Sequence, residues 1–292
     1  MKKILAIVLS LMLVVGLFAA CGNDANKEAT NPATEGSAEG ATEAPTEAAT
    51  EAPTEAPTEG AAELKTVTPG KLTMATNAFF PPYEYYEGDK IVGIDAEIAE
   101  AIAAKLGLEL VISNMEFNSI ITAVTTGAAD FGLAGMTVTE ERLLEVDFST
   151  SYAKGVQAIV VKEGSEITSY DVLAAEGAAY KIGVQLGTTG DIYASDEFGD
   201  RVTQYNNGNE AVLALQAGDI DCIIIDNEPA KAFVAANDGL AVLESTYADE
   251  DYAACVAKGN EALLEAIDNA IMELTADGTI DAIVAKYIPT EE

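Results

Sequence analysis

Apolar and polar positions divide residues 65–292 into alternating strand-like and helix-like segments. The short run "KLTMAT" at 71–76 predicts a strand, and "DAEIAEAIAAKLG" at 95–107 predicts a helix that ends at Gly107, a residue typical of C-caps. Apolar residues recur around this helix at the spacing of one face: Ile94, Ile98, Ile102 and Leu106. This order of strands and helices predicts an α/β fold with largely parallel sheets covered by helices.

The same pattern continues to the end of the chain. Further strands are expected at 108–113, 130–135, 181–186 and 221–226. Further helices are expected at 118–127, 209–218 and 228–237. Residues 260–288 predict two more helices, separated by Asp277 and Gly278.

Two stretches of the chain resemble each other. "NSIITAVTTGAADFGLAG" begins at Asn118 and "NEAVLALQAGDIDCIIID" begins at Asn209. The identical pairs are Asn118 and Asn209, Ala123 and Ala214, Gly127 and Gly218, and Asp130 and Asp221. Any connection from a helix to a strand could show a few such identities. Both stretches, however, have the same order of helix, glycine and strand, which favours two similar α/β lobes that begin with the strands "KLTMATN" and "KIGVQLG".

This alignment places Gly135 and Asp226 at the same position, the C-terminal end of a parallel strand, in two different lobes. Ligands of open α/β sheets bind outside the carboxyl ends of the strands. Two lobes that face each other would form a cleft there, with Arg142 following Gly135 on one wall and Asp226 on the other.

The first 64 residues are expected to lie outside this fold. Residues 1–20 have a basic start and an apolar core, and "LFAACGN" resembles a lipoprotein signal in which Cys21 is lipidated. An ordinary cleaved signal or an uncleaved anchor are the alternatives. Residues 22–64 repeat small, polar and acidic residues, which predicts a disordered, extended linker. The domain is therefore expected on the outer face of the cell membrane, held by a lipid anchor.

Composition excludes several functions. The chain has 49 acidic and 15 basic side chains, a formal net charge of −34, which argues against nucleic acid or an anionic membrane surface as partners. Histidine is absent, which removes the commonest general base and metal ligand. Cys222 and Cys255 lie in apolar, strand-like runs, where free buried thiols are favoured over a bridge. We expect a monomer with no cofactor and no metal.

Arg142 is one of only two arginines, and it lies in the expected first turn of a helix, where the helix dipole disfavours a cation. A guanidinium there suits the carboxylate of an α-amino acid, with backbone N–H groups from Gly135 to Thr139 and the Thr137 hydroxyl as helpers. Asp226 could accept the ammonium group. The alternatives are a surface ion pair of Arg142 with Glu141 or Glu145, and a helix N-cap role for Asp226.

Residues 70–288 resemble the extracellular solute-binding proteins of polar amino acid ABC transporters. The segments that carry the resemblance are "LTMATNAFFPPYEYYEGDKIVGIDAEIAEAIAAKLG", "LAGMTVTEERLLEVDFS", "IGVQLGTTGDIY" and "MELTADGTIDAIVAKYI". The resemblance implies a type II periplasmic binding protein-like fold, with lobe 1 at 65–152 and 254–292 and lobe 2, including two hinge strands, at 153–253. It also implies hinge closure around the ligand and docking on a membrane permease.

The resemblance assigns roles to particular residues. Arg142, Gly135 and Thr137 would hold the α-carboxylate, together with Thr189 and its neighbour Thr188 on the "GTTG" turn. Asp226 would hold the α-ammonium group. The rings that would sandwich the ligand are Phe80 and Phe117.

Two departures from the family pattern concern specificity. Asn77 stands where many relatives have aspartate, and Gln185 stands where some have lysine. Two neutral amides favour a ligand with a neutral polar side chain over a cationic one, although Glu84 or Glu116 could still approach.

A binding role is expected rather than catalysis. The same fold family includes dehydratases and wall-cleaving domains, in which carboxylates such as Asp226 or Glu84 could act as general acid or base. The sequence contains no nucleophile beside a base and no clustered metal ligands. A ligand-sensing domain is the third possibility, but such domains are usually fused to a membrane helix and a signalling module.

Overall fold

A computed structural model describes residues 64–243 and 249–288, and all of them belong to one compact unit. The expected signal segment, Cys21 and nearly all of the linker at 22–64 lie outside the described residues. None of the helices in the described part is long and apolar enough to cross a membrane.

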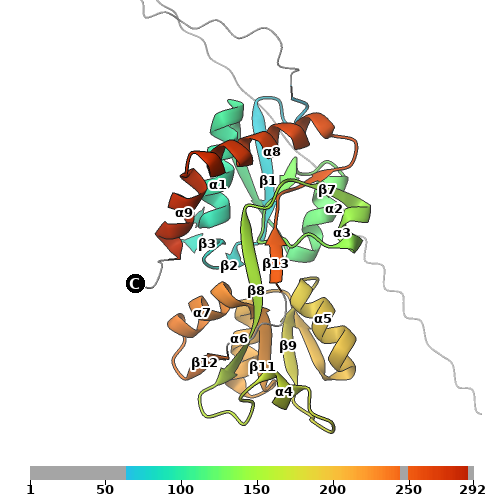
Figure 1. The fold of residues 1–292 in the computed structure, drawn as a ribbon, viewed down its shortest axis with the longest axis vertical. Helices are drawn as coiled ribbons and strands as arrows, with labels where there is room; N and C mark the ends of the chain where they lie inside the picture. The colour runs from blue at the N-terminus through green and yellow to red at the C-terminus, as the bar shows by residue number, and fades with distance from the viewer. Residues whose placement is uncertain (1–63, 244–248, 289–292) are drawn as a thin grey trace, which may run out of the picture. The chain divides into compact units, whose positions relative to one another are not determined.

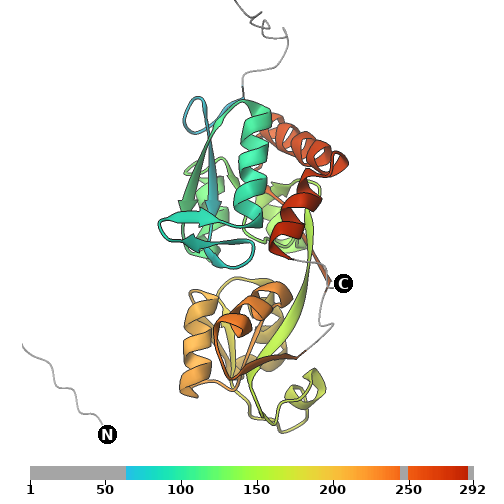
Figure 2. The same cartoon turned by 90° about the vertical axis from the view of Figure 1, so that its left-hand side faces the viewer.

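The first of two large sheets takes strands from both ends of the domain, and we call it, with its helices, lobe 1 (Figures 1 and 2). Its strand order is β5-β1-β6-β14-β7. The strands are β1 (Lys71–Thr76), β5 (Glu109–Asn114), β6 (Phe131–Gly132), β7 (Val146–Phe148) and β14 (Cys255–Ala257). The helices are α1 (Ile94–Leu106), η1 (Phe117–Ser119), α2 (Ile120–Thr125), α3 (Glu140–Glu145), α8 (Glu261–Ala276) and α9 (Thr279–Tyr287). A small sheet follows β1 and consists of β2 (Phe79–Phe80), β3 (Glu84–Glu87) and β4 (Lys90–Val92).

The second large sheet has the order β10-β9-β11-β8-β12, and with its helices it forms lobe 2. Its strands are β8 (Ala153–Lys162), β9 (Ile182–Gln185), β10 (Val202–Tyr205), β11 (Cys222–Asp226) and β12 (Leu240–Leu243). Its helices are α4 (Tyr170–Leu173), α5 (Thr189–Phe198), η2 (Gly199–Arg201), α6 (Gly208–Ala217) and α7 (Asn227–Ala236). The start of β8 pairs with β13 (Asp249–Tyr252), and these two antiparallel strands lead from one sheet to the other (Figure 1).

The two lobes share one topology, which confirms the predicted duplication. In lobe 1, β5, β1 and β6 are parallel and β14 is antiparallel to β6. In lobe 2, β10, β9 and β11 are parallel and β8 is antiparallel to β11. The register agrees as well: Phe131 pairs with Met74, and its counterpart Cys222 pairs with Ile182.

The identities seen in the sequence have structural causes. Gly127 and Gly218 both end a helix with a positive φ, 73° and 85°, which a residue with a Cβ rarely adopts. The carboxylate of Asp130 accepts the backbone N–H of Thr73 at 2.6 Å, and that of Asp221 accepts the backbone N–H of Lys181 at 2.7 Å. Each aspartate therefore fastens β6 or β11 to the neighbouring parallel strand, β1 or the start of β9.

Burial explains the apolar strands. In β11, Cys222 and Ile224 pack with Ala194 of α5, while Ile223 and Ile225 pack on the opposite face with α6 and α7. Side chains of a strand alternate between the two faces, so a strand covered on both sides must be apolar throughout. Asp226, the last residue of β11, leaves this core at the carboxyl end of the strand.

Most of the predicted elements are present, with some different bounds. The strand expected at 130–135 is only Phe131–Gly132, and the chain turns further on, at Gly135, with a φ of 52°. The helix expected at 118–127 begins as a 3-10 turn and becomes α-helical only at Ile120–Thr125. The two C-terminal helices and the break at Asp277 and Gly278 agree with the prediction.

Candidate functional site

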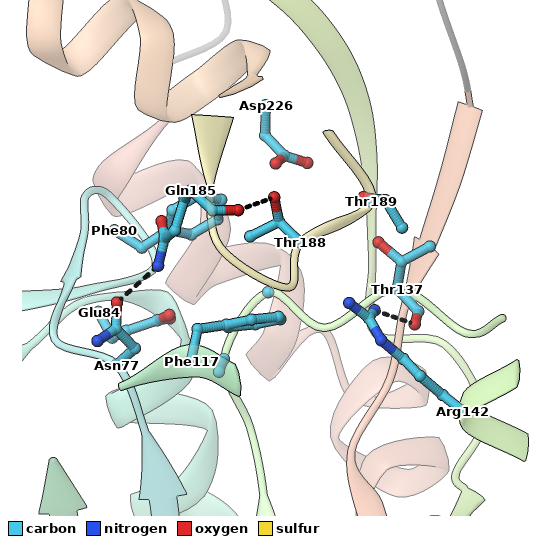
Figure 3. A pocket seen from close by; sticks show the side chains of 12 residues that line it. Asn77, Phe80, Glu84, Phe117, Thr137, Arg142, Gln185, Thr188, Thr189 and Asp226 are labelled. Atoms are coloured by element: carbon cyan, nitrogen blue, oxygen red, sulfur yellow. Dashed lines mark hydrogen bonds between the residues drawn. The ribbon is translucent and has the colours of Figure 1, made fainter. Parts of the chain in front are cut away.

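A small pocket lies where the two lobes meet, and its walls come from both (Figure 3). It contains all ten predicted site residues: Asn77, Phe80, Phe117, Gly135, Thr137, Arg142, Gln185, Thr188, Thr189 and Asp226. Glu84 and Ala134 complete the lining.

Arg142 is buried, with 7% of its surface exposed, and it points into the pocket. Its Nη1 donates to the carbonyl oxygen of Thr137 at 2.6 Å, and its Nη2 donates across the cleft to the carbonyl oxygen of Gly187 at 3.0 Å. The guanidinium also lies 5.4 Å from the ring centre of Phe117. Burial lowers the pKa of this group, while the nearby carboxyl groups of Glu250 and Asp226 raise it. The alternative of a surface ion pair with Glu141 or Glu145 is therefore wrong.

Gly135 brings the backbone of lobe 1 to the pocket. Its positive φ disfavours any side chain, and a Cβ would lie 2.8 Å from the ring of Phe80. Its N–H donates to Asp95 at 2.7 Å, and the hydroxyl of Tyr152 donates to the same oxygen at 2.8 Å. The pocket loop is thus fixed by a carboxylate at the start of α1.

Asp226 lines the opposite wall and is 5% exposed. Tyr252 donates its hydroxyl proton to Oδ1 of Asp226. Burial, and then the charge of Glu250, raise the pKa of Asp226 well above its ordinary value. Asp226 stands at the N-cap position of α7, but its side chain makes no capping hydrogen bond, so the predicted alternative of a capping role is wrong.

Two amides meet at one end of the pocket. Gln185 donates from Nε2 to Oδ1 of Asn77 at 3.0 Å, across the two lobes (Figure 3). The register makes these residues counterparts, because each lies three positions beyond a paired residue, Met74 in β1 and Ile182 in β9. Asn77 is held further by donating to the carbonyl oxygen of Met115 at 2.7 Å.

Glu84 lies beside the amides and is fully buried. Among the described residues its one hydrogen-bonding neighbour is the carboxyl group of Asp95. Burial and the neighbouring Asp95 raise the pKa of Glu84 well above its ordinary value. The pKa of Asp95 is raised by burial to about 6, while hydrogen bonds from Gly135 and Tyr152 act in the opposite direction.

The three threonines of the site have distinct local roles. Thr188 caps α5 by accepting from the N–H of Asp191, and it also donates to the carbonyl oxygen of Gln185. Thr189 accepts from Gln157 at 3.4 Å. Thr137 donates its hydroxyl proton to Glu250 at 3.0 Å.

Sequence reasoning missed several residues. Ala134 lines the pocket, and Glu250, Tyr252 and Gln157 surround Asp226. The strand sequence "DEDY" is acidic at its first three positions, so it shows no alternation that would indicate which residues face inward. Glu116, one of the two glutamates considered for the pocket, is exposed and does not line it.

Other chemistry finds little support in the described residues. In that part of the chain, no group of three or more Cys, Asp or Glu residues is arranged to hold a metal ion. Cys222 and Cys255 are both buried and free, as predicted. Burial raises the pKa of each thiol to about 12, which makes them unreactive.

Two similar α/β lobes, joined by two strands and enclosing a polar pocket, define a type II periplasmic binding protein fold. The model of the family Bacterial extracellular solute-binding proteins, family 3, matches residues 72–290. The chain belongs to this family. It is an extracellular solute-binding protein.

Relatives and solved structures agree with this assignment. The Arginine-binding extracellular protein ArtP of Bacillus subtilis is 34% identical over 76% of this chain and 88% of its own length. The substrate binding protein of an amino acid ABC transporter is 36% identical with a TM-score of 0.72, over 76% of this chain and 100% of that one. An ancestral arginine-binding protein bound to glutamine is 38% identical with a TM-score of 0.72, over 76% and 99%.

Proposed function

We propose that this protein binds a polar L-amino acid between its two lobes and delivers it to the permease of an ABC transporter. The observation that carries the proposal is the placement of Arg142 and Asp226 in one small pocket, on walls from different lobes. Membership of family 3 and the amino acid ligands named for its relatives support it.

The charges of the pocket suit the two ends of an amino acid. A planar guanidinium can form two parallel hydrogen bonds to a carboxylate, and Arg142 uses only two of its five N–H groups on described carbonyls. Asp226 would accept the ammonium group. Both charged residues are buried, so each interacts with a ligand charge more strongly than it would in water.

The proposed side chain of the ligand is polar and neutral, because it would meet the amides of Asn77 and Gln185. A cationic side chain is the second candidate, and one observation favours it. Glu84 lines the same pocket with two buried oxygens whose one described hydrogen-bonding neighbour is the carboxyl group of Asp95, and a guanidinium or ammonium group of a ligand could donate to them. Titration with L-glutamine and L-arginine separates the two candidates.

Binding is proposed to work by hinge closure. We propose lobe 1 at 65–152 and 254–292 and lobe 2 at 153–253, with β8 and β13 as the hinge. A ligand that contacts both walls favours the closed state by the difference in its contacts between the two states. The cross-lobe hydrogen bonds of Arg142 to Gly187 and of Gln185 to Asn77 form only when the walls are close.

The membrane attachment is also part of the proposal. A lipid on Cys21 and an extended linker at 22–64 would hold a monomeric domain at the outer face of the cell membrane, within reach of the permease. A binding role without catalysis and without a cofactor is proposed because the relatives are named as binding proteins.

Arg142→Ala tests the proposal, with Arg201→Ala as a matched control. Arg201 is the second arginine and holds lobe 2 together by donating to the carbonyls of Tyr180 and Leu173. Isothermal titration calorimetry should show that Arg142→Ala weakens amino acid binding by about 2–5 kcal/mol. Arg201→Ala should lower the unfolding temperature and leave the affinity within about threefold. Unchanged affinity in Arg142→Ala would overturn the assignment.

A further inference from the structure

The ammonium-binding wall contains a second carboxyl group that belongs to the hinge. Glu250 lies on β13, opposite Gly155 of β8, and only 3% of its surface is exposed. Strand alternation points Glu250 and Tyr252 inward and Asp251, between them, to the surface. Gly155 leaves the space that the ring of Tyr252 needs, because a Cβ there would lie 2.2 Å from the tyrosine oxygen.

The contacts of Glu250 join both lobes. Its Oε2 accepts the hydroxyl of Thr137, from lobe 1, at 3.0 Å. The same oxygen accepts Nε2 of Gln157, from lobe 2, at 3.1 Å. Its Oε1 is buried and has no donor among the described residues.

Two contacts place Glu250 beside Asp226. Gln157, which donates to Glu250, is the partner of Asp226 in the pairing of β8 with β11, and Tyr252, two residues along β13 from Glu250, donates to Asp226. A hydrogen bond between the two carboxyl groups requires a proton, since two carboxylates have no donor between them. Two buried carboxyl groups in contact do not ionise together, because their charges repel and neither is solvated by water. Burial and the charge of Glu250 raise the pKa of Asp226, and the hydroxyl of Tyr252 lowers it.

Few cationic groups lie near Asp226 and Glu250 that could neutralise a second negative charge in place of the shared proton. The titratable groups that act on the pair from other elements and from β13 are Tyr83, Glu84, Arg142, Tyr193 and Tyr252. Only Arg142 among them is a cation, and its guanidinium donates to the carbonyl oxygens of Thr137 and Gly187.

We propose that Glu250 is a positioning residue of the ammonium site: it shares one proton with Asp226 before the ligand binds, and the ligand's ammonium group takes that proton's place. The proton passes to the solvent, and no covalent bond changes. The N–H groups of the ligand then donate where the shared proton did. This inference rests on the proposed function and adds to it a coupling between binding and proton release.

The sign of the pH dependence follows from this exchange. Binding requires loss of the shared proton, so a falling pH, which favours that proton, weakens binding. The limiting slope is about a tenfold loss of affinity per pH unit in the range where the pair keeps its proton. Over this range the amino group of the ligand stays protonated and adds no opposing effect.

The test is calorimetric titration of the full chain with L-glutamine and L-arginine from about pH 5 to 8, in two buffers of different ionisation enthalpy. The wild-type protein should release about one proton per ligand at the acidic end and bind at least about tenfold more weakly there than at pH 8. Glu250→Gln keeps an acceptor for Thr137 and Gln157 and offers Asp226 a permanent N–H donor. It should release almost no proton, and its affinity should change less than about threefold over the same range.

Asp251→Asn is the matched control, because it removes one carboxylate from the same strand at the exposed position that pairs with Lys154. It should behave as the wild type. Equal proton release in the wild type and Glu250→Gln would overturn the role of Glu250 and leave the proposed function standing. Absence of binding by either amino acid at every pH would overturn both.

A measurement without ligand tests the shared proton directly. Because the pKa of Asp226 is raised in the folded state, its contribution to the unfolding free energy is full at acidic pH and is lost as the pH rises. In urea unfolding, the free energy of unfolding should fall less with rising pH in Glu250→Gln than in the wild type or in Asp251→Asn. An equal loss in all three would contradict the shared proton.

Discussion

Lobe 1 and lobe 2 have the same strand order, the same strand directions and the same register, but opposite chemistry at the pocket. Gly135, followed by Arg142, stands on one wall, and Asp226, the counterpart of Gly135, stands on the other. The residues that fasten the strands are identical in the two lobes, as Asp130 and Asp221 show. The two lobes thus have the same sheet topology but different residues just beyond the ends of the strands. A pair of similar lobes can therefore present unlike charges to one asymmetric ligand.

The two fastening aspartates offer the largest expected difference between the lobes. Asp130 is buried and accepts the backbone N–H groups of both Val67 and Thr73, each at 2.6 Å. Asp221 is exposed, and within the described part of the chain its carboxylate accepts the backbone N–H of Lys181 alone. Asp130→Ala should lower the free energy of unfolding by about 3 kcal/mol or more, and Asp221→Ala by about 1 kcal/mol. Urea unfolding of both variants measures this, and equal losses would show that the lobes depend on their aspartates alike.

A second difference concerns the carboxylates that hold the pocket loops. Asp95 accepts from Gly135 in lobe 1, and Asp191 accepts from Gly187 at 2.9 Å in lobe 2, but only Asp95 lies against another buried carboxyl group, that of Glu84. The pKa of Asp95 is raised to about 6, so its contribution to stability is full below about pH 4 and is lost as the pH rises through 6.

As the pH rises from 4 to 7, the free energy of unfolding of the wild type should fall by at most about 3 kcal/mol through the deprotonation of Asp95. The fall should be smaller in Asp95→Asn. Unfolding in urea between pH 4 and 7 provides the measurement. Asp191→Asn removes the equivalent loop contact and is the control, because among the described residues the other partners of the Asp191 side chain are the neutral groups of Ser195 and Gln204. The same pH profile in the wild type and in Asp95→Asn would disprove the effect.

The smallest expected effect concerns the amides that meet across the cleft. Gln185→Ala removes the hydrogen bond to Asn77 and should weaken lobe closure by about 0.5–1.5 kcal/mol. Small-angle scattering of the ligand-free protein should then show a larger radius of gyration, which a saturating amino acid restores. Gln204→Ala, which removes bonds to Asp191 within lobe 2, should leave the radius unchanged. An equal radius of gyration in the wild type and both variants would show that the hydrogen bond between Gln185 and Asn77 does not contribute to closure.

Much of this architecture could be predicted from the sequence because it depends on local rules. Glycines that end helices, such as Gly127 and Gly218, and apolar strands covered on both faces leave direct marks in the sequence. These features were sufficient to align the two lobes in the sequence. From that alignment, Gly135 and Asp226 were predicted to line one pocket.

The interior of the hinge could not be predicted in the same way. Glu250 and Tyr252 are distant in sequence from Thr137 and Asp226, and they are brought together by the pairing of β13 with β8 and by the β-bridge between Thr137 and Tyr252. The sequence also suggested a capping role for Asp226, because a residue before a helix gives no information on whether its side chain turns toward the helix or toward the pocket.

The central claim is that Arg142 and Asp226 hold opposite ends of one amino acid. The most direct test titrates the wild type, Arg142→Ala and Asp226→Asn with the amino acid, its α-amide and its deaminated acid. The account predicts that the wild type rejects both analogues. Arg142→Ala should lose only the preference for the carboxylate, and Asp226→Asn only the preference for the ammonium group. If each variant still discriminates against the analogue that lacks its own partner, the two residues do not bind the ligand's charges.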